Sequence, residues 1–208
     1  MEIAVKTEDP RPLSRAHAVE KVGHAENESA VRTLVRPAVP DDAEAIAAVH
    51  IASWQAAYRG QLPDDFLDGL ESQFRARADF WRQEIASPRT ASHEIWVATL
   101  AGHLRGFVAL GPARDANSRV TGEVYAIYVH PNTWRQGLGT MLFTRAMTRL
   151  AALGFSKTIL WVLQSNTPAR RFYELAGWSA DGRTKLETLP GGIELREVCY
   201  QKKIRLPN

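Results

Sequence analysis

The segment of residues 122–153 places the strongest constraint on the fold of this chain. Residues 122–130 are rich in aromatic and β-branched side chains, which favour a strand. Gly137 and Gly139 then open a stretch whose apolar residues recur at helical spacing. Glycines at the start of a helix let main-chain amides approach a ligand without interference from a Cβ atom. Because the helix dipole also favours negative charge there, the segment predicts a phosphate-binding turn.

Composition limits the class of protein. The 208 residues suit one sizeable domain, and 45% hydrophobic with 24% charged residues is ordinary for a soluble protein. We find neither a signal peptide nor an apolar run near the ~20 residues that a membrane span needs. The single cysteine, Cys199, fits a reducing compartment, and a net charge of +3 is too small to indicate nucleic acid. The six histidines show no metal-ligand spacing. We therefore expect a cytoplasmic protein with no metal, nucleic-acid or membrane partner.

Along the chain, the pattern predicts a flexible extension over residues 1–30 and a single domain over residues 31–208. The expected order is β-α-α-β-β-β-α-β-α-β-β, which indicates an α/β or α+β sheet with helices on its faces. The expected strands are residues 31–36, 93–100, 104–110, 122–130, 157–163 and two within 178–203. The expected helices begin near Pro40, Leu62, Gly137 and Ser165, the second running to about Trp81 and the last to Ala176.

A second motif follows the glycine turn about thirty residues downstream. Asn166 and Tyr173 are seven residues apart, so they share one face of the expected helix, which Gly177 ends. In order and spacing, residues 129–142 together with residues 166–178 resemble the GNAT superfamily of acyl-CoA-dependent N-acetyltransferases. The resemblance covers about residues 34–204, and the motif that begins at Trp54 is similar to one branch of the family.

The resemblance implies a mixed, mostly antiparallel sheet of about seven strands, splayed between the fourth and fifth. The cofactor it implies is acetyl-CoA, whose pantetheine arm would lie in the splay and bond to the main chain of Ile127, Tyr128 and Val129. The pyrophosphate would be held by amides of Arg135, Gln136, Gly137, Leu138, Gly139 and Thr140. Asn166 would bond the cofactor or a bridging water, the alternative being a simple helix cap. The side chain of Arg135 or Arg170 could add a charge-assisted contact to phosphate, the alternative for each being a solvated arginine.

The reaction requires a base, because a free amine with a pKa near ~10.4 is mostly protonated at neutral pH. Glu123 is the first candidate, since it lies six residues before Val129 and is expected on the same strand face. The resemblance also places a catalytic glutamate there; the alternative is a surface glutamate without a role. His130, expected on the opposite face, is the second candidate. Tyr173 matches the family's general-acid tyrosine. Cys199 could carry an acyl group, but we favour a buried, inert thiol.

Other positions stay open between two readings. Trp54 and Tyr58 lie four residues apart on one helical face, where they would line an acceptor pocket or pack in the core. Trp134 stands where the family usually has glutamine or arginine, and Arg135 where it often has glycine. Main-chain amides do most of the phosphate binding, so we expect the loop to survive both changes.

The sequence thus predicts an enzyme that transfers acetyl from acetyl-CoA to a primary amine of a small molecule or protein N-terminus. Transfer is expected by direct attack in a ternary complex. The alternative is a non-catalytic acyl-CoA-binding sensor or interaction domain. Nucleoside-triphosphate binding is disfavoured because no lysine follows the glycines as in a P-loop. The identity of the acceptor and the formation of a homodimer stay open.

Overall fold

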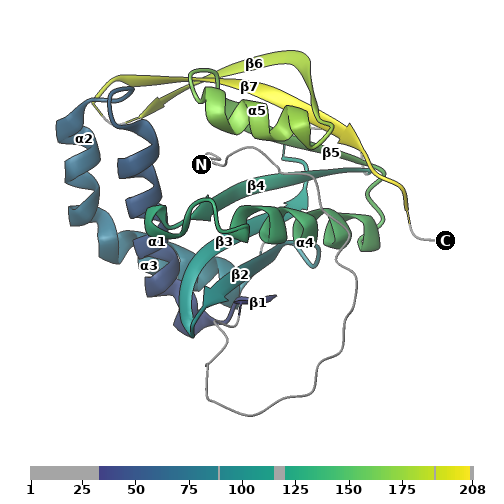
Figure 1. Cartoon of the computed structure of the whole chain (residues 1–208), viewed down its shortest axis with the longest axis horizontal. Coiled ribbons are helices and arrows are strands. Elements are labelled where there is room, and N and C mark those ends of the chain that lie inside the picture. The colour runs from purple at the N-terminus through teal and green to yellow at the C-terminus, as the bar shows by residue number, and fades with distance from the viewer. Residues whose placement is uncertain (1–32, 89, 115–119, 190, 207–208) are drawn as a thin grey trace, which may run out of the picture.

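The computed structural model describes residues 33–88, 90–114, 120–189 and 191–206. A seven-stranded sheet in the order β1-β2-β3-β4-β5-β7-β6 carries helices on both faces (Figure 1). All strand pairs are antiparallel except β4 with β5. The predicted fold class is confirmed, and so is the order of elements except for one additional helix. The predicted extension over residues 1–30 lies outside the described residues.

The elements follow the predicted order, with one difference in the first helical region. The strands are β1 (Thr33–Pro37), β2 (Glu94–Leu100), β3 (His103–Pro112), β4 (Thr121–Val129), β5 (Lys157–Leu163), β6 (Ser179–Leu189) and β7 (Ile193–Lys203). The α-helices are α1 (Ala43–Tyr58), α2 (Asp64–Gly69), α3 (Phe74–Ala86), α4 (Leu138–Ala152) and α5 (Thr167–Leu175). Short 3-10 turns cover Pro40–Asp42, Leu70–Gln73 and Pro131–Thr133.

The predicted second helix is two helices, α2 and α3. The 3-10 turn Leu70–Gln73 separates them, and a 3-10 turn winds more tightly than an α-helix. This tighter turn changes which side chains face inward, so that Leu67, Leu70 and Trp81 are all buried. None of the described helices has the length and apolar character needed to cross a membrane.

The sheet separates two hydrophobic cores. Successive strand residues point to opposite faces, so in β3 Phe107 packs toward α1 and α3, whereas Val108 packs toward α4. Phe172 of α5 and Phe143 of α4 belong to the same core as Val108. Helices α4 and α5 therefore cover one face, and α1 and α3 cover the other (Figure 1).

β4 and β5 pair over only a short length. Their parallel register runs from Thr121 opposite Lys157 to Val124 opposite Leu160 and then stops. β4 continues to Val129, while β5 continues along β7 as far as Leu163. The two strands diverge beyond this point (Figure 1). The splay between the fourth and fifth strands is therefore confirmed.

A β-bulge interrupts the alternation of β4. Ala126 lies opposite Ala109 and Val124 lies opposite Leu110, so Tyr125 is an additional residue on the β4 side of the β3–β4 pair. A bulge of this kind changes which side chains share a face, because it adds one residue to a two-residue repeat.

The prediction that Glu123 and Val129 share a face is wrong for this reason. Val129 lies beside Leu142 of α4, in the core of that face. Glu123 instead binds Arg114, whose guanidinium stacks on the ring of Tyr125 and faces the side covered by α3. The bulge therefore directs Glu123 toward the helices α1 and α3.

The close approach of α4 to β3 gives a stability prediction. A Cβ atom on Gly106 would lie 2.9 Å from Leu142 Cδ1 and 3.0 Å from the main-chain oxygen of Tyr128. Because that oxygen belongs to β4, we expect Gly106→Ala to lower the free energy of unfolding by ~1–3 kcal/mol. Gly69, at the end of α2, has helical φ and open space around it. Gly69→Ala should instead raise the free energy of unfolding by ~0.5–1 kcal/mol. Urea denaturation measures both, and equal stability of the two variants would contradict the packing.

Candidate active site

The turn before α4 has the backbone geometry of a main-chain anion site. Arg135 and Gly137 have φ of 68° and 81°, in the left-handed region, which is typical of loops whose amides point to one ligand. Glycine adopts this conformation readily and arginine does so at a cost. Leu138, Gly139 and Thr140 form the first turn of α4, where amides have no acceptor within the helix. The predicted residues therefore form one turn at a positive helix end, in which Leu138 and Gly139 are buried and the others are exposed.

Trp134 fastens this turn to the end of β4. Its indole Nε1 donates a hydrogen bond of 2.6 Å to the carbonyl oxygen of Val129. The same oxygen accepts a buried hydrogen bond of 2.9 Å from Ser53 Oγ of α1. Trp134, which departs from the family pattern, thus holds the loop through a bond to the strand. Gln136, by contrast, is exposed, and its amide makes only a long contact of 3.4 Å with the carbonyl oxygen of Asn132.

The main chain of β4 is open where the strand leaves β5. His130 N donates to Arg105 O of the neighbouring chain segment at 2.7 Å, so the main chain of His130 faces β3. Because main-chain groups alternate along a strand, the main chain of Tyr128 also faces β3. The main chains of Ile127 and Val129 face the gap between the diverging strands β4 and β5. Of the three predicted pantetheine contacts, the structure therefore turns Ile127 and Val129 toward the gap.

Two buried polar groups of the α5 region have no partner among the described residues. Asn166 Oδ1 caps α5 by accepting from Ala169 N at 3.2 Å, but its Nδ2 is unpaired, and so is the hydroxyl of Tyr173. Unpaired buried groups cost ~1–3 kcal/mol each, so they call for a ligand or another reason. Burial raises the pKa of Tyr173 well above its ordinary range, and the nearby Tyr128 adds to the shift. Tyr173 is therefore a protonated donor at neutral pH.

Arg170 has a structural role. Its Nη1 donates to Gln164 O at 3.0 Å, and its Nε contacts the hydroxyl of Tyr200 at 3.2 Å. Tyr200 donates in turn to Glu174 Oε1 at 2.5 Å, which connects α5 to β7. The predicted contact of Arg170 with phosphate stays a prediction.

Glu123 is buried, and both of its carboxylate oxygens accept hydrogen bonds from Arg114. Its side chain is 1% exposed and accepts from Arg114 N at 2.9 Å, from Arg114 Nε at 3.1 Å and from Arg114 Nη2. Sequence reasoning missed Arg114, because it lies between the expected strands of residues 104–110 and 122–130, in a stretch given no role. His130, the second candidate base, accepts from Asn132 N at 3.2 Å. Burial lowers the pKa of His130, and Arg105 lowers it further.

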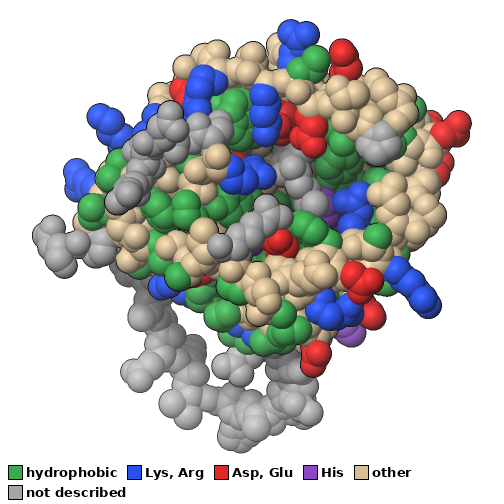
Figure 2. Space-filling view, turned by 180° about the vertical axis from the view of Figure 1, so that it is seen from behind, with side chains coloured by type: hydrophobic (Ala, Val, Ile, Leu, Met, Phe, Trp, Pro, Cys, Tyr) green, Lys and Arg blue, Asp and Glu red, His purple; other side chains and the backbone are tan. Residues whose placement is uncertain are grey.

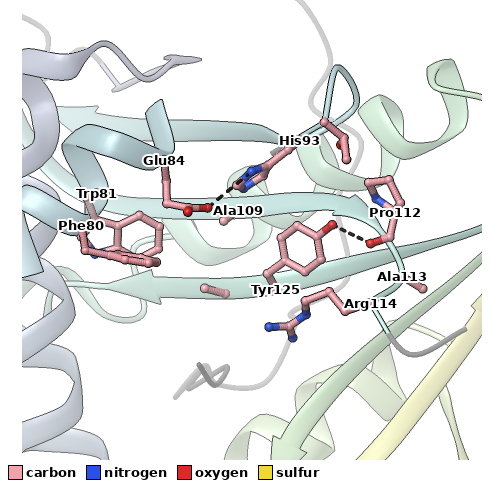
Figure 3. A pocket seen from close by; sticks show the side chains of 11 residues that line it. Phe80, Trp81, Glu84, His93, Ala109, Pro112, Ala113, Arg114 and Tyr125 are labelled. Carbon is pink, nitrogen blue, oxygen red and sulfur yellow. Dashed lines mark hydrogen bonds and ion pairs between the residues drawn. The ribbon is translucent and has the colours of Figure 1, made fainter. Parts of the chain in front are cut away.

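A cavity of about 360 Å³ lies between α3 and the face of the sheet that carries Glu123. Figure 3 shows the Tyr125 ring between the aromatic pair from α3 and the end of β3, with a Glu84–His93 pair at one side. That pair has an Oε2–Nδ1 distance of 3.5 Å. The side chains named in Figure 3 belong to Phe80, Trp81, Glu84, His93, Ala109, Pro112, Ala113, Arg114 and Tyr125. In the sequence, only the apolar character of the α3 pair was apparent.

Trp54 and Tyr58 lie elsewhere. They are 5% and 0% exposed, their ring centroids are 5.1 Å apart, and neither lines this cavity. Trp54 Nε1 donates to the hydroxyl of Tyr128 at 3.0 Å. Their surroundings correspond to the core-packing alternative. Cys199 is buried in β7, as expected, with Arg183 Nη2 at 3.0 Å from its sulfur.

In the part of the chain that the structure describes, no cluster of His, Cys, Asp and Glu could hold a metal ion.

Comparisons with known proteins agree with this geometry. The model of the acetyltransferase (GNAT) family matches residues 41–178. The uncharacterised N-acetyltransferase YuaI of Bacillus subtilis is 30% identical, over 79% of this chain and 89% of its own. Phosphinothricin N-acetyltransferase of Streptomyces viridochromogenes is 25% identical, over 83% of this chain and 88% of its own. The PaiA N-acetyltransferase of Thermoplasma acidophilum, solved with coenzyme A, superposes with a TM-score of 0.62 at 18% identity. That superposition covers 83% of this chain and 99% of the other.

The shared acceptor at Val129 gives a second prediction. Ser53→Ala or Trp134→Phe alone leaves the Val129 oxygen with one donor, so each loss should cost ~0.5–1.5 kcal/mol. The double variant leaves a buried carbonyl without either donor. We therefore expect it to cost about 1 kcal/mol more than the sum of the single variants. Urea unfolding of the four proteins measures this coupling, and strict additivity would show that the two bonds act independently.

Proposed function

Because this chain belongs to the acetyltransferase (GNAT) family, we propose that it transfers the acetyl group of acetyl-CoA to a primary amine. The amine belongs to a small molecule or a protein N-terminus, and it attacks directly within a ternary complex. The observation that carries the proposal is the buried hydroxyl of Tyr173 and the side-chain amide of Asn166, which have no partner among the described residues and lie on the α4–α5 side of the splayed strands.

The described residues fit coenzyme A. The amides from Arg135 to Thr140 take the pyrophosphate at the positive end of α4. The main chain of Ile127 and the N–H of Val129 take the amides of the pantetheine arm, as an open strand edge does, while the Val129 oxygen stays bonded to Trp134 and Ser53. Asn166 Nδ2 gains a partner on this side. The cofactor supplies an activated thioester carbonyl, and the protein supplies its orientation.

The acceptor amine approaches from the opposite face of the sheet. Helices α4 and α5 carry the cofactor-binding groups on one face of the sheet, so the acceptor takes the other face, where a cavity lies between α3 and the sheet. The cavity beside Tyr125 and Arg114 opens on that side, and its aromatic walls suit an apolar or flat acceptor body. Seen from behind, the molecular surface is hollowed near its centre, with acidic and basic side chains around the hollow (Figure 2).

Two residues handle protons in this proposal. Glu123 accepts the proton of the attacking amine, which requires its pair with Arg114 to loosen when the acceptor binds. Tyr173 gives a proton to the departing thiolate, a role that suits a phenol whose pKa is raised by burial. Arg114 thereby becomes a positioning residue for Glu123.

Release of free thiol from acetyl-CoA across a panel of primary amines tests the reaction. The wild-type chain should turn over at least one amine of the panel. Tight coenzyme A binding without turnover on any amine would instead favour the acyl-CoA-binding sensor.

The role of Tyr173 predicts a split between catalysis and binding. Tyr173→Phe removes the proton donor but keeps the ring that packs between Phe143 and Tyr200, so it should lower kcat ~10–100-fold. Coenzyme A affinity should stay nearly the same, because the phosphate-binding turn is untouched. Thiol-release kinetics and calorimetric titration measure the two quantities. An unchanged kcat would remove Tyr173 from the mechanism.

The phosphate-binding turn predicts a loss of affinity at Gly137. A Cβ at this residue meets no atom within 4 Å, so Gly137→Ala acts only through its φ of 81°. We expect the strained turn to weaken coenzyme A binding by about tenfold, since L-residues disfavour this region by ~1–2 kcal/mol. Gly102, in the β2–β3 turn, has φ of 79° and equally open space, and Gly102→Ala is the matched control. Equal affinities for both variants would place the pyrophosphate elsewhere.

A further inference from the structure

Glu197 is a buried carboxylate whose oxygens are poorly satisfied. Its side chain is 0% exposed, and Lys185 Nζ lies 2.7 Å from Oε2 across the β6–β7 pair. Within the described ranges, neither oxygen receives a hydrogen bond of proper geometry, and Oε1 has no charged partner. A buried carboxylate with a free oxygen is costly, so its presence calls for a reason.

The position of Glu197 links it to the splayed strands. In the β5–β7 register, Glu197 lies opposite Leu163, beyond the point at Leu160 where β5 leaves β4. Leu195 packs in the core of α1 and α3, and alternation puts Glu197 on the same face as Leu195. This is the face from which the acceptor amine approaches in the proposed function. Glu197 therefore flanks the gap on the acceptor side, from the β5–β7 half of the sheet.

The charged groups that act on Glu197 are Lys185, Glu187 and, at longer range, Arg114. Burial raises the pKa of Glu197 more than Lys185 lowers it, and Glu187 of β6 raises it further. Burial works to lower the pKa of Arg114, but Glu123 and, at longer range, Glu197 raise it above its ordinary value. The thiol of Cys199 lies two residues along the same strand face. One ammonium, Lys185, thus faces a carboxylate that retains an unused oxygen.

Trp161 adds a second cation-favouring surface beside this carboxylate. Lys185 Nζ lies 4.7 Å and Arg183 Cζ 5.5 Å from its ring centroid. Trp161 is the first β5 residue after the paired segment, so it stands where the gap opens. Cations next to an aromatic face and a carboxylate are stabilised by both.

We propose that the Glu197 carboxylate binds the positively charged nitrogen of the acceptor amine. This assignment rests on the proposed function. An ammonium has three N–H donors, and Oε1 of Glu197 can accept one without displacing Lys185. Glu123 cannot serve in the same way, because Arg114 already gives it three hydrogen bonds. Glu197 therefore holds the amine while it is still protonated. Glu123 then accepts the proton from it.

Binding of two matched probes to the full-length protein loaded with coenzyme A tests this assignment. Benzylamine is a cation at pH 7 and carries a ring that suits the aromatic cavity, whereas benzyl alcohol has the same shape without charge. Calorimetry should show wild-type protein binding benzylamine more tightly. Glu197→Gln should weaken benzylamine binding about tenfold or more, the scale of a lost hydrogen bond to a charged group, and leave benzyl alcohol unchanged. Glu197→Asp, which keeps the charge, should retain part of the preference.

Glu194→Gln is the matched control, since Glu194 is exposed and lies on the opposite face of the same strand. It should leave the binding of both probes unchanged. Equal benzylamine affinity in wild type and Glu197→Gln overturns the proposal, and so does a wild type that binds benzylamine no better than benzyl alcohol. Thiol release with benzylamine is measured separately on the same proteins. Absent turnover in a wild type whose amine binding depends on Glu197 would reject the transfer reaction and keep the binding site.

Discussion

The divergence of β4 from β5 after four paired positions is the constraint on which the rest of the site depends. A parallel pair that continued would use the main-chain groups of Ile127 and Val129 within the sheet. Since β5 is held by β7 alone beyond Leu160, β5 does not use those groups, and the Val129 oxygen accepts from Trp134 and Ser53 instead. The same divergence lets α5 bring Tyr173 and Asn166 to one side of the gap, while charged side chains reach the other.

The two acceptor-side carboxylates are buried to a similar degree but differ in their partners. Glu123 accepts three hydrogen bonds from one arginine, which fixes its direction. Glu197 has one ammonium and an unused oxygen, so it can still bind a cation. Environments that differ in this way let two groups of one chemical type take different tasks in one site. Binding of the amine and removal of its proton can then be assigned to opposite sides of the gap.

Local patterns predicted most of the fold, including the elements that carry the proposed cofactor-binding residues. The turn at Gly137 and the helix that carries Tyr173 each depend on a contiguous stretch of residues. Both elements are at the positions predicted from the sequence. The orientation of Glu123 could not be predicted, because a bulge opposite Ala109 is decided by pairing between strands. Glu197 and the cavity were also missed, since both arise from contacts between distant elements. An aromatic pair such as Trp54 and Tyr58 has the same sequence pattern in a core as in a pocket.

The Trp134 position shows why the turn before α4 can depart from the family pattern. Every residue except proline supplies a main-chain N–H group. For binding an anion, the direction of these N–H groups therefore matters more than the side chains of the same residues. Arg135 adopts a left-handed backbone conformation, which is unfavourable for a residue other than glycine. Contacts of the surrounding residues have to offset this strain. The indole bond from Trp134 to Val129, reinforced by Ser53 of α1, ties the strained turn to the open strand edge. The same carbonyl therefore links α1, the end of β4 and the turn before α4, so a displacement of one of them displaces the others.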